Sequence, residues 1–396
     1  MIRIALAMLA ADRAKFFGLL FGIAFTSFLV TFAASYFCGF MTRGFSLVSE
    51  NPQADVWVMD PAVNSVEQTI NLPDSALERV RGVAGVRSAS ALALGNVDVR
   101  FANGRFQPVQ VIGVDNATLA GAPPLPGIDR SLLRSPDAAI IDAGGTDGKL
   151  LTPLLAADRW PHDGAHLDAA TRELRAGDEL LVNDRLVRVL GVSHGLARFP
   201  PRPLLYMTLA NASRILPIEP HRLTFVLAHA TEGTDPAALA SRIAAATGLR
   251  ARSNADFRAD TVRWYLINSE DVGDIGAMLI LAMTMGFGVT GVMLYMFSYE
   301  NQRQYAVLKA IGAQPRTLVG MVLVQAGACA LIGTGIGLGV CGIAGWVVQD
   351  MGFPFRMLWF TPLAGILGVL LVCGLAAAIS IRPVVKLQPA VVFAGR

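Results

Sequence analysis

Residues 275–299 read IGAMLILAMTMGFGVTGVMLYMFSY, and residues 300–316 continue as ENQRQYAVLKAIGAQPR. The first stretch contains no charged residue. An α-helix rises about 1.5 Å per residue, so roughly 20 apolar residues cross the hydrocarbon core of a bilayer. The first stretch therefore predicts a membrane-spanning helix, and the second predicts a polar connector outside the bilayer.

Three further uncharged stretches, residues 16–40, 317–349 and 357–381, are also long enough to cross a membrane. The chain as a whole is 53% hydrophobic and 16% charged, whereas soluble domains have about 25% charged residues. Helices are expected because lipid cannot satisfy free backbone N–H and C=O groups. We predict four transmembrane helices. A cleaved signal peptide is the alternative for residues 16–40. The apolar core of a signal peptide is only about 7 to 15 residues long, however, and this apolar run is longer.

The distribution of charge predicts the orientation. The short segments 1–15, 300–316 and 382–396 together carry nine basic and two acidic residues. The long segment 43–274 carries 23 basic and 27 acidic residues. The positive-inside rule then places both termini and the connector in the cytoplasm. Residues 41–256 are expected to form an extracytoplasmic domain, and residues 350–356 a short periplasmic loop.

The extracytoplasmic domain has an α+β pattern. Asn103-Gly104 and Asn183-Asp184 are typical of hairpin turns between alternating strands. Residues 74–81 and 235–246 begin with helix-start signals that include Pro73 and Pro236. We therefore predict strands and helices at both ends of the domain.

Two further segments of this domain have their own character. Residues 123–203 are rich in Pro, Gly and Asp and predict an inserted second lobe with long loops. Residues 257–274 have a helical pattern and predict a stalk helix that continues into the second span. The fold class is thus a four-helix membrane domain with a two-lobed α+β domain.

The sequence gives no support for a catalytic or metal site. Gly191-Val192-Ser193-His194-Gly195 matches the G-x-S-x-G nucleophile elbow, but the Pro-rich residues 199–203 follow where a helix is needed. His162 and His166 lie in a segment with Pro161 and Gly164, which is typical of a surface loop. We expect a non-catalytic chain without a metal site.

Nucleotide binding is not expected either, because Gly148-Lys149 is followed by Leu150 where a phosphate-binding loop requires Ser or Thr. All four cysteines lie in the apolar stretches, so no disulfide framework is predicted. Small residues at four-residue spacing allow spans to approach closely, within one chain or between two. The expected packing glycines are Gly286, Gly291, Gly333, Gly337 and Gly339.

The connector has the pattern of a short helix. Tyr305, Leu308 and Ile311 recur at helical spacing, and Gly312 is a helix stop. One interpretation is an amphipathic helix lying on the lipid surface.

A second interpretation comes from the motif itself. Residues 304–313, QYAVLKAIGA, resemble the E-x-A-x-L-K-A-[ILM]-G-A core of FtsX-like, MacB-type ABC transporter permeases. Ile381-Arg382-Pro383 and Gln388-Pro389-Ala390 resemble the ending of that family, and the order of spans matches it. Two positions depart from the pattern, because Gln304 and Gln388 stand where the family commonly has Glu and Asp. The connector and the Trp264-Tyr265 pair most resemble the DevC-like branch.

This resemblance implies a homodimeric permease in the bacterial inner membrane that binds a separate ATPase subunit. ATP and Mg²⁺ would be held by the ATPase, and the permease would bind no cofactor directly. The connector would be the coupling helix. Its expected contact residues are Glu300, Arg303, Tyr305, Leu308, Lys309, Ile311, Gly312 and Arg316.

The resemblance leaves two functions open. The first is export or extrusion of a lipid, peptide or drug-like substrate, with a periplasmic membrane-fusion adapter as partner. The second is FtsX-like mechanotransmission, in which the permease regulates an extracytoplasmic enzyme without moving cargo. A membrane-anchored enzyme ranks third, since it would depend on Ser193 or His162.

Overall fold

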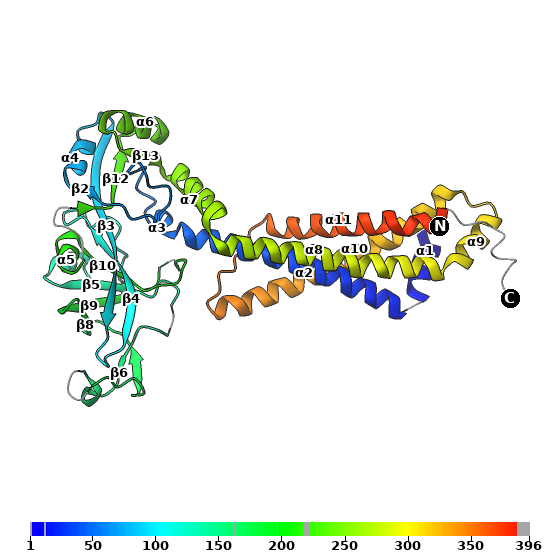
Figure 1. Ribbon diagram of the computed structural model, residues 1–396, viewed down its shortest axis with the longest axis horizontal. Helices are drawn as coiled ribbons and strands as arrows, with labels where there is room; N and C mark the ends of the chain where they lie inside the picture. The colour runs from blue at the N-terminus through cyan, green and yellow to red at the C-terminus, as the bar shows by residue number, and fades with distance from the viewer. Residues whose placement is uncertain are drawn as a thin grey trace. The chain divides into compact units, whose positions relative to one another are not determined.

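The chain folds into two units (Figure 1). The computed structural model describes residues 2–11, 13–146, 148–160, 164–195, 197–216 and 222–385. One unit, here called the helical unit, comprises Met1–Phe40 and Ser269–Arg396. The other, the sheet unit, comprises Met41–Asn268.

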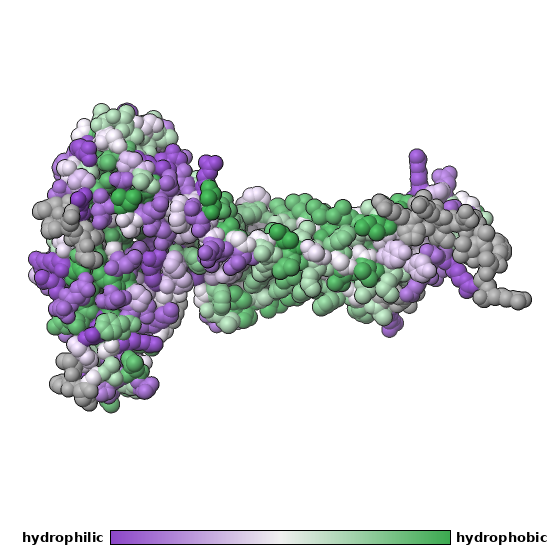
Figure 2. Space-filling model, viewed as in Figure 1, coloured by the Kyte–Doolittle hydropathy of each residue, from purple (hydrophilic) through white to green (hydrophobic). Residues whose placement is uncertain are grey.

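Among its described residues, the helical unit contains four helices long and apolar enough to cross a membrane. Their outer surfaces are rich in apolar side chains (Figure 2), including Leu331, Trp346 and Ile343, which are 78%, 73% and 69% exposed. Exposed apolar surfaces of this extent are stable in contact with lipid, whereas their contact with water would be unfavourable. The four long helices are α2 (Arg13–Gly44), α8 (Glu270–Glu300), α10 (Pro315–Asp350) and α11 (Thr361–Val385), and the shorter ones are α1 (Ile2–Ala11) and α9 (Gln302–Ala310).

The fourth span begins later than predicted. We expected it at residue 357, but α11 begins at Thr361. The preceding residues form a turn, in which the Thr361 amide donates to the Leu358 carbonyl at 3.0 Å. The Arg356 amide also donates to the Ser35 carbonyl of α2 at 3.0 Å. The loop between α10 and α11 is therefore longer than the predicted 350–356. Of the predicted tail, residues 386–396 lie outside the described residues.

The two sequence ends of the sheet unit form a ferredoxin-like lobe. Its strands follow the order β13-β1-β12-β3, all antiparallel, which is the split βαβ arrangement. Helices α4 and α6 bury Val80, Leu239 and Ile243 in one core with Val56 and Val226 of the sheet. The elements are β1 (Val56–Met59), α4 (Ser75–Arg81), β3 (Val86–Arg100), β12 (Phe225–Ala230), α6 (Pro236–Thr247) and β13 (Arg250–Ser253).

The middle of the sheet unit forms a six-stranded barrel. The strand order continues β3-β4-β10-β5-β9-β8, and β8 pairs back to β3 through Val182 opposite Val99. Alternate residues such as Val111, Ile141 and Val187 point into a second core. The further strands are β4 (Phe106–Val114), β5 (Ala138–Asp142), β8 (Glu179–Val182), β9 (Arg185–Ser193) and β10 (Leu204–Thr208).

Short elements connect these strands. Two pairs of short strands form small separate sheets, β2 with β11 and β6 with β7. The bounds are α3 (Ser46–Glu50), β2 (Leu72–Pro73), η1 (Arg130–Arg134), β6 (Leu151–Pro153), η2 (Ala156–Asp158), β7 (Thr171–Glu173), α5 (Leu209–Ile215) and β11 (Arg222–Leu223).

The second lobe is larger than the predicted insertion at residues 123–203. It also includes β4, β10 and the end of β3, because these strands complete the ring. The insertion is therefore not a separate module hanging from a loop, since its strands continue the sheet of the ferredoxin-like lobe. The predicted class, four apolar helices with a two-lobed α+β domain, is confirmed.

Both predicted hairpin turns are present. Gly104, between β3 and β4, has a positive φ of 85°. Asn183 and Asp184, between β8 and β9, have φ values of 46° and 62°, as a type I′ turn requires at both central residues.

The predicted stalk helix is interrupted. Helix α7 (Asn254–Asn268) ends before α8 begins, because Ser269 has extended backbone angles of φ −94° and ψ 125°. The Asn268 side chain donates to the Trp264 carbonyl at 2.8 Å, which satisfies an acceptor near the end of α7. Phe257 of α7 lies in an aromatic cluster with Trp57 and Phe225, with ring centroids 5.5 to 5.9 Å apart.

Candidate functional site

The connector between α8 and α10 contains one short helix, α9. Its end is set by Gly312, whose φ is +104°. The Gly312 amide donates to the Lys309 carbonyl at 3.1 Å, and the Ala313 amide donates to the Leu308 carbonyl at 2.9 Å. This pair of bonds is a Schellman motif, which needs a left-handed residue that glycine adopts at no cost. Pro315 then opens α10, so the chain turns within four residues.

One face of α9 is buried in the helical unit. Tyr305 and Ala306 are both fully buried, and they pack with Leu318, Met321 and Val322 of α10. Leu308 is half-buried at the edge of the same cluster. The burial of Tyr305 corrects our expectation that this residue contacts the ATPase, because its side chain faces the chain's own helices.

A chain of hydrogen bonds joins three helices at this face. The Tyr305 hydroxyl donates to Gln325 Oε1 of α10 at 3.1 Å. Gln325 Nε2 donates in turn to the Ala5 carbonyl of α1 at 2.9 Å. Burial raises the pKa of Tyr305 to about 12, although the hydrogen bond to Gln325 opposes the shift. The phenol therefore stays neutral and remains a donor at physiological pH.

The other face of α9 is open. Arg303 is exposed, Val307 is 42% exposed, and Ile311 in the turn after the helix is 79% exposed. Among the other predicted contact residues, Glu300, Gly312 and Arg316 are exposed and Lys309 is half-buried. An apolar pair flanked by basic residues on a short rigid helix is suited to bind a complementary groove on another protein.

The predicted packing glycines differ in their surroundings. A Cβ added to Gly286 would lie 2.1 Å from Thr26 Oγ1, one on Gly333 would lie 2.7 Å from Ile23, and one on Gly337 would lie 2.4 Å from the Ala24 carbonyl oxygen. These three glycines bring α8 and α10 close to α2 within one chain. By contrast, a Cβ on Gly291 would have only an ordinary contact, at 3.9 Å from Ala376, and one on Gly339 would meet nothing within 4 Å.

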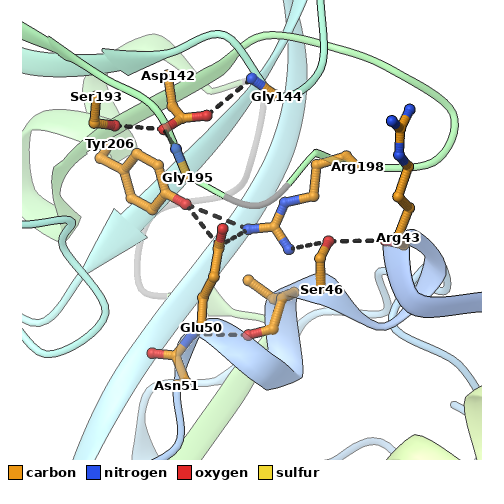
Figure 3. Close-up of polar contacts among 11 residues, drawn as sticks. Arg43, Ser46, Glu50, Asn51, Asp142, Gly144, Ser193, Gly195, Arg198 and Tyr206 are labelled. Atoms are coloured by element: carbon orange, nitrogen blue, oxygen red, sulfur yellow. Dashed lines mark hydrogen bonds and ion pairs between the residues drawn. The ribbon is translucent and has the colours of Figure 1, made fainter. Parts of the chain in front are cut away.

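Ser193 is not placed as a hydrolase nucleophile. It is 7% exposed and its hydroxyl donates to Asp142 Oδ2 at 2.5 Å (Figure 3). The same Asp142 oxygen accepts the Gly195 amide at 2.6 Å. The Asp142 carboxylate thus stabilises the turn that contains Ser193 and Gly195. No group of three metal-ligating side chains occurs among the described residues, and His162 lies outside them.

These features define a membrane protein that presents a short, well-fixed connector helix and a separate α+β unit. Residues 276–389, which include the connector, match the family model for the FtsX-like permease C-terminal domain. This part of the chain therefore belongs to the FtsX-like permease family. The resemblance inferred from residues 304–313 is confirmed at the level of the family.

Two solved structures are similar to parts of this chain. The periplasmic region of MacB from Actinobacillus actinomycetemcomitans is 11% identical, with a TM-score of 0.36, over 56% of this chain and 96% of that chain. The extracellular domain of the noncanonic ABC-type transporter YknZ from Gram-positive bacteria is 14% identical, with a TM-score of 0.32, over 50% of this chain and 98% of that chain. No curated protein matches the chain.

Proposed function

We propose that this chain is the permease subunit of an ABC transporter and that the open face of α9 binds a separate ATPase subunit. The observation that carries the proposal is the two-sided character of α9. Its inner face is fixed by Tyr305 and Ala306, while Val307 and Ile311 face outward. A helix held in this way passes a push on its outer face to α1 and α10.

The chain would lie in a bacterial inner membrane with both termini in the cytoplasm, as the distribution of basic residues indicates. It would act as a homodimer, with ATP and Mg²⁺ held by the ATPase. Movement of α9 would reach the sheet unit through the spans. The expected result is extrusion of a lipid, peptide or drug-like substrate with the help of a membrane-fusion adapter.

The contact with the ATPase is tested by Ile311→Asp. The full chain is purified from its own membranes, and the ABC ATPase retained with it is identified and its ATP turnover measured. We expect Ile311→Asp to lower the ATP turnover of the co-purified ATPase by roughly tenfold or more, since loss of one apolar anchor at an interface has effects of this size. The substitution leaves the buried face of α9 unchanged.

Met351→Asp is the matched control, because Met351 is 67% exposed in the loop at the other end of α10. It should retain the ATPase as the unsubstituted chain does. Equal retention and turnover with Ile311→Asp would contradict the proposal. If both variants bind fewer ATPase molecules, the effect is one of general folding, and the proposed contact loses its support.

The orientation of α9 has a separate test. The four native cysteines are buried, so a cysteine placed at the exposed residue Gln304 can be labelled selectively. An impermeant thiol reagent should label Gln304→Cys only after the cells are opened, whereas it should label Arg185→Cys in the sheet unit of intact spheroplasts. Labelling of Gln304→Cys in intact spheroplasts would place the connector on the wrong side.

A further inference from the structure

A buried polar cluster in the sheet unit has no part in the function proposed above. It consists of Arg198, Glu50, Tyr206 and Ser46, here called the junction cluster (Figure 3). Ser46 and Glu50 lie on α3, directly after the end of α2, whereas Tyr206 lies on β10 of the barrel. The cluster therefore joins two parts of the sheet unit that are remote in sequence.

Arg198 lies at the centre of the cluster and is only 5% exposed. Its Nη2 donates to Glu50 Oε2 and, at 3.3 Å, to the Tyr206 hydroxyl. Its Nη1 donates to Ser46 Oγ at 3.0 Å. The Tyr206 hydroxyl donates to Glu50 Oε2 at 3.1 Å, and burial raises the pKa of Tyr206, so the phenol stays a donor. Arginine is suited to this position because its planar fork reaches several acceptors at once.

The backbone that carries Arg198 is fixed to the barrel. The Arg198 amide donates to the Gly144 carbonyl at 3.1 Å. Asp142, which is 1% exposed at the end of β5, accepts the amides of Gly144 and Gly195 at 2.8 and 2.6 Å. A Cβ on Gly195 would lie 2.9 Å from Glu50 Oε1, so a larger residue there would require the Glu50 carboxylate to shift. Arg198 thus belongs to the barrel by its backbone and to α3 by its side chain.

Helix α7 contacts α3 and the residues that directly follow it. The Asn254 side-chain amide lies within hydrogen-bond distance of the carbonyls of Asn51 and Ala54, at 3.3 and 3.2 Å. A Cβ on Gly44, the last residue of α2, would lie 2.6 Å from the Tyr265 ring of α7. The end of α2 and helix α7, which lead to the first and second spans, therefore contact each other next to α3.

We propose that Arg198 is a positioning residue that makes the barrel move with α3 and α7 as one body. The proposal rests on the proposed function in one respect, because the ATPase is the source of the movement of the spans. Two charges buried against each other hold a fixed geometry, and removal of one partner alone leaves the other unpaired. The junction cluster is thus placed to pass a displacement of the span ends to the barrel.

The test measures one distance inside the sheet unit of the full chain, reconstituted in nanodiscs with its ATPase. Spin labels are attached at Asp184 in the β8–β9 turn and at Arg263 on α7, both of which are exposed. In the otherwise unchanged chain we expect one narrow distance distribution, the same with and without ATP. The double variant Arg198→Met with Glu50→Gln removes both charges together and so avoids an unpaired buried charge.

In this double variant the distribution should broaden and depend on nucleotide. The ratio of molecules outside the narrow peak to molecules within it should rise about tenfold, within the range of measured coupling changes. The single variant Arg198→Lys retains the charge pair with Glu50 and should keep most molecules within the narrow peak. Arg172→Met with Asp178→Asn removes another charged pair of this unit, one joined at 2.6 Å, and should leave the peak narrow.

A narrow, nucleotide-independent peak in the Arg198 and Glu50 double variant would overturn the inference. The ATPase contact would still stand if Ile311→Asp had lowered ATP turnover. If the double variant does not fold, Tyr206→Phe with Ser46→Ala removes the flanking hydrogen bonds and retains the charge pair. That variant should broaden the peak to a smaller extent, and an unchanged peak would again count against Arg198 as the positioning residue.

Discussion

Tyr305 shows how one hydroxyl can fix a short helix against its neighbours. The group is fully buried and joins α9 to Gln325, which in turn joins α1. Tyr305→Phe leaves Gln325 Oε1 without this donor, so the free energy of unfolding should fall by about 1 kcal/mol. Thermal unfolding of the purified chain in detergent measures the change.

The control for this substitution is Tyr299→Phe, because Tyr299 is 57% exposed. It should leave the unfolding temperature unchanged. An equal loss in both variants would show that the hydroxyl of Tyr305 has no special role in holding α9.

The pKa of Asp260 predicts how the stability of the sheet unit changes at acidic pH. Burial raises the pKa of Asp260, but hydrogen bonds from Arg252 and Arg250 outweigh this effect and hold the pKa below its ordinary value. The ionised form is therefore stabilised by folding. This contribution is present above the unfolded pKa of about 3.9 and is lost as pH falls through the lower, folded pKa.

Asp260→Asn should consequently lower the free energy of unfolding at neutral pH by up to about 1 kcal/mol, since the pair is partly exposed to solvent. It should also flatten the dependence of stability on pH below about pH 4. Hydrogen exchange of β13 amides, compared at neutral and acidic pH, measures both effects. An acid dependence equal to that of the original chain would show that Asp260 does not cause it.

At the scale of the helices, close approach between α2 and α10 depends on Gly337. An added Cβ would lie 2.4 Å from the Ala24 carbonyl oxygen. Gly337→Ala should lower the stability of the helical unit by about 1 to 3 kcal/mol, because backbone cannot move aside as a flexible side chain can. Unfolding in a denaturing detergent titration gives the value.

Gly339 provides the comparison two residues away. A Cβ there would meet nothing within 4 Å, and alanine favours helix over glycine by up to about 1 kcal/mol. Gly339→Ala should therefore leave the stability of the isolated chain unchanged or raise it. A loss as large as that of Gly337→Ala would mean that glycine matters along the whole helix and not at one contact.

Local signals in the sequence were sufficient for several elements. The four spans, the two hairpin turns and the stop at Gly312 each follow from residues that lie next to one another. The closure of the barrel could not be predicted in this way, because Val99 and Val182 pair across a long separation in sequence. The junction cluster was missed for the same reason, although Arg198 stands beside the Pro-rich segment that excluded a hydrolase elbow.

The connector was predicted only in part. Tyr305, Leu308 and Ile311 share helical spacing, which suggested one common face. Helix α9 ends at Ala310, however, so Ile311 lies in the turn and is 79% exposed while Tyr305 is buried. The end of a short helix decides which of its residues face outward, and that end is known only to within a residue or two from sequence.

At the scale of the whole molecule, the division into two units predicts that Met41–Asn268 folds without the spans. Its three cores are formed by residues of this segment alone. The fragment should be soluble and monomeric, and it should unfold in one cooperative transition followed by circular dichroism. An insoluble fragment, or one that shows no transition, would mean that this unit needs the helical unit to fold.

The long strand β3 has a consequence for how the sheet unit can vary. Its 15 residues supply Ala89 and Ala91 to one core, Leu92 and Leu94 to a second, and Val97 and Val99 to a third. Successive side chains point to opposite faces, so one inserted residue would move every later side chain to the opposite face and take Val97 and Val99 out of their core. The loops of either lobe can therefore vary in length more readily than this strand, which contributes to all three cores.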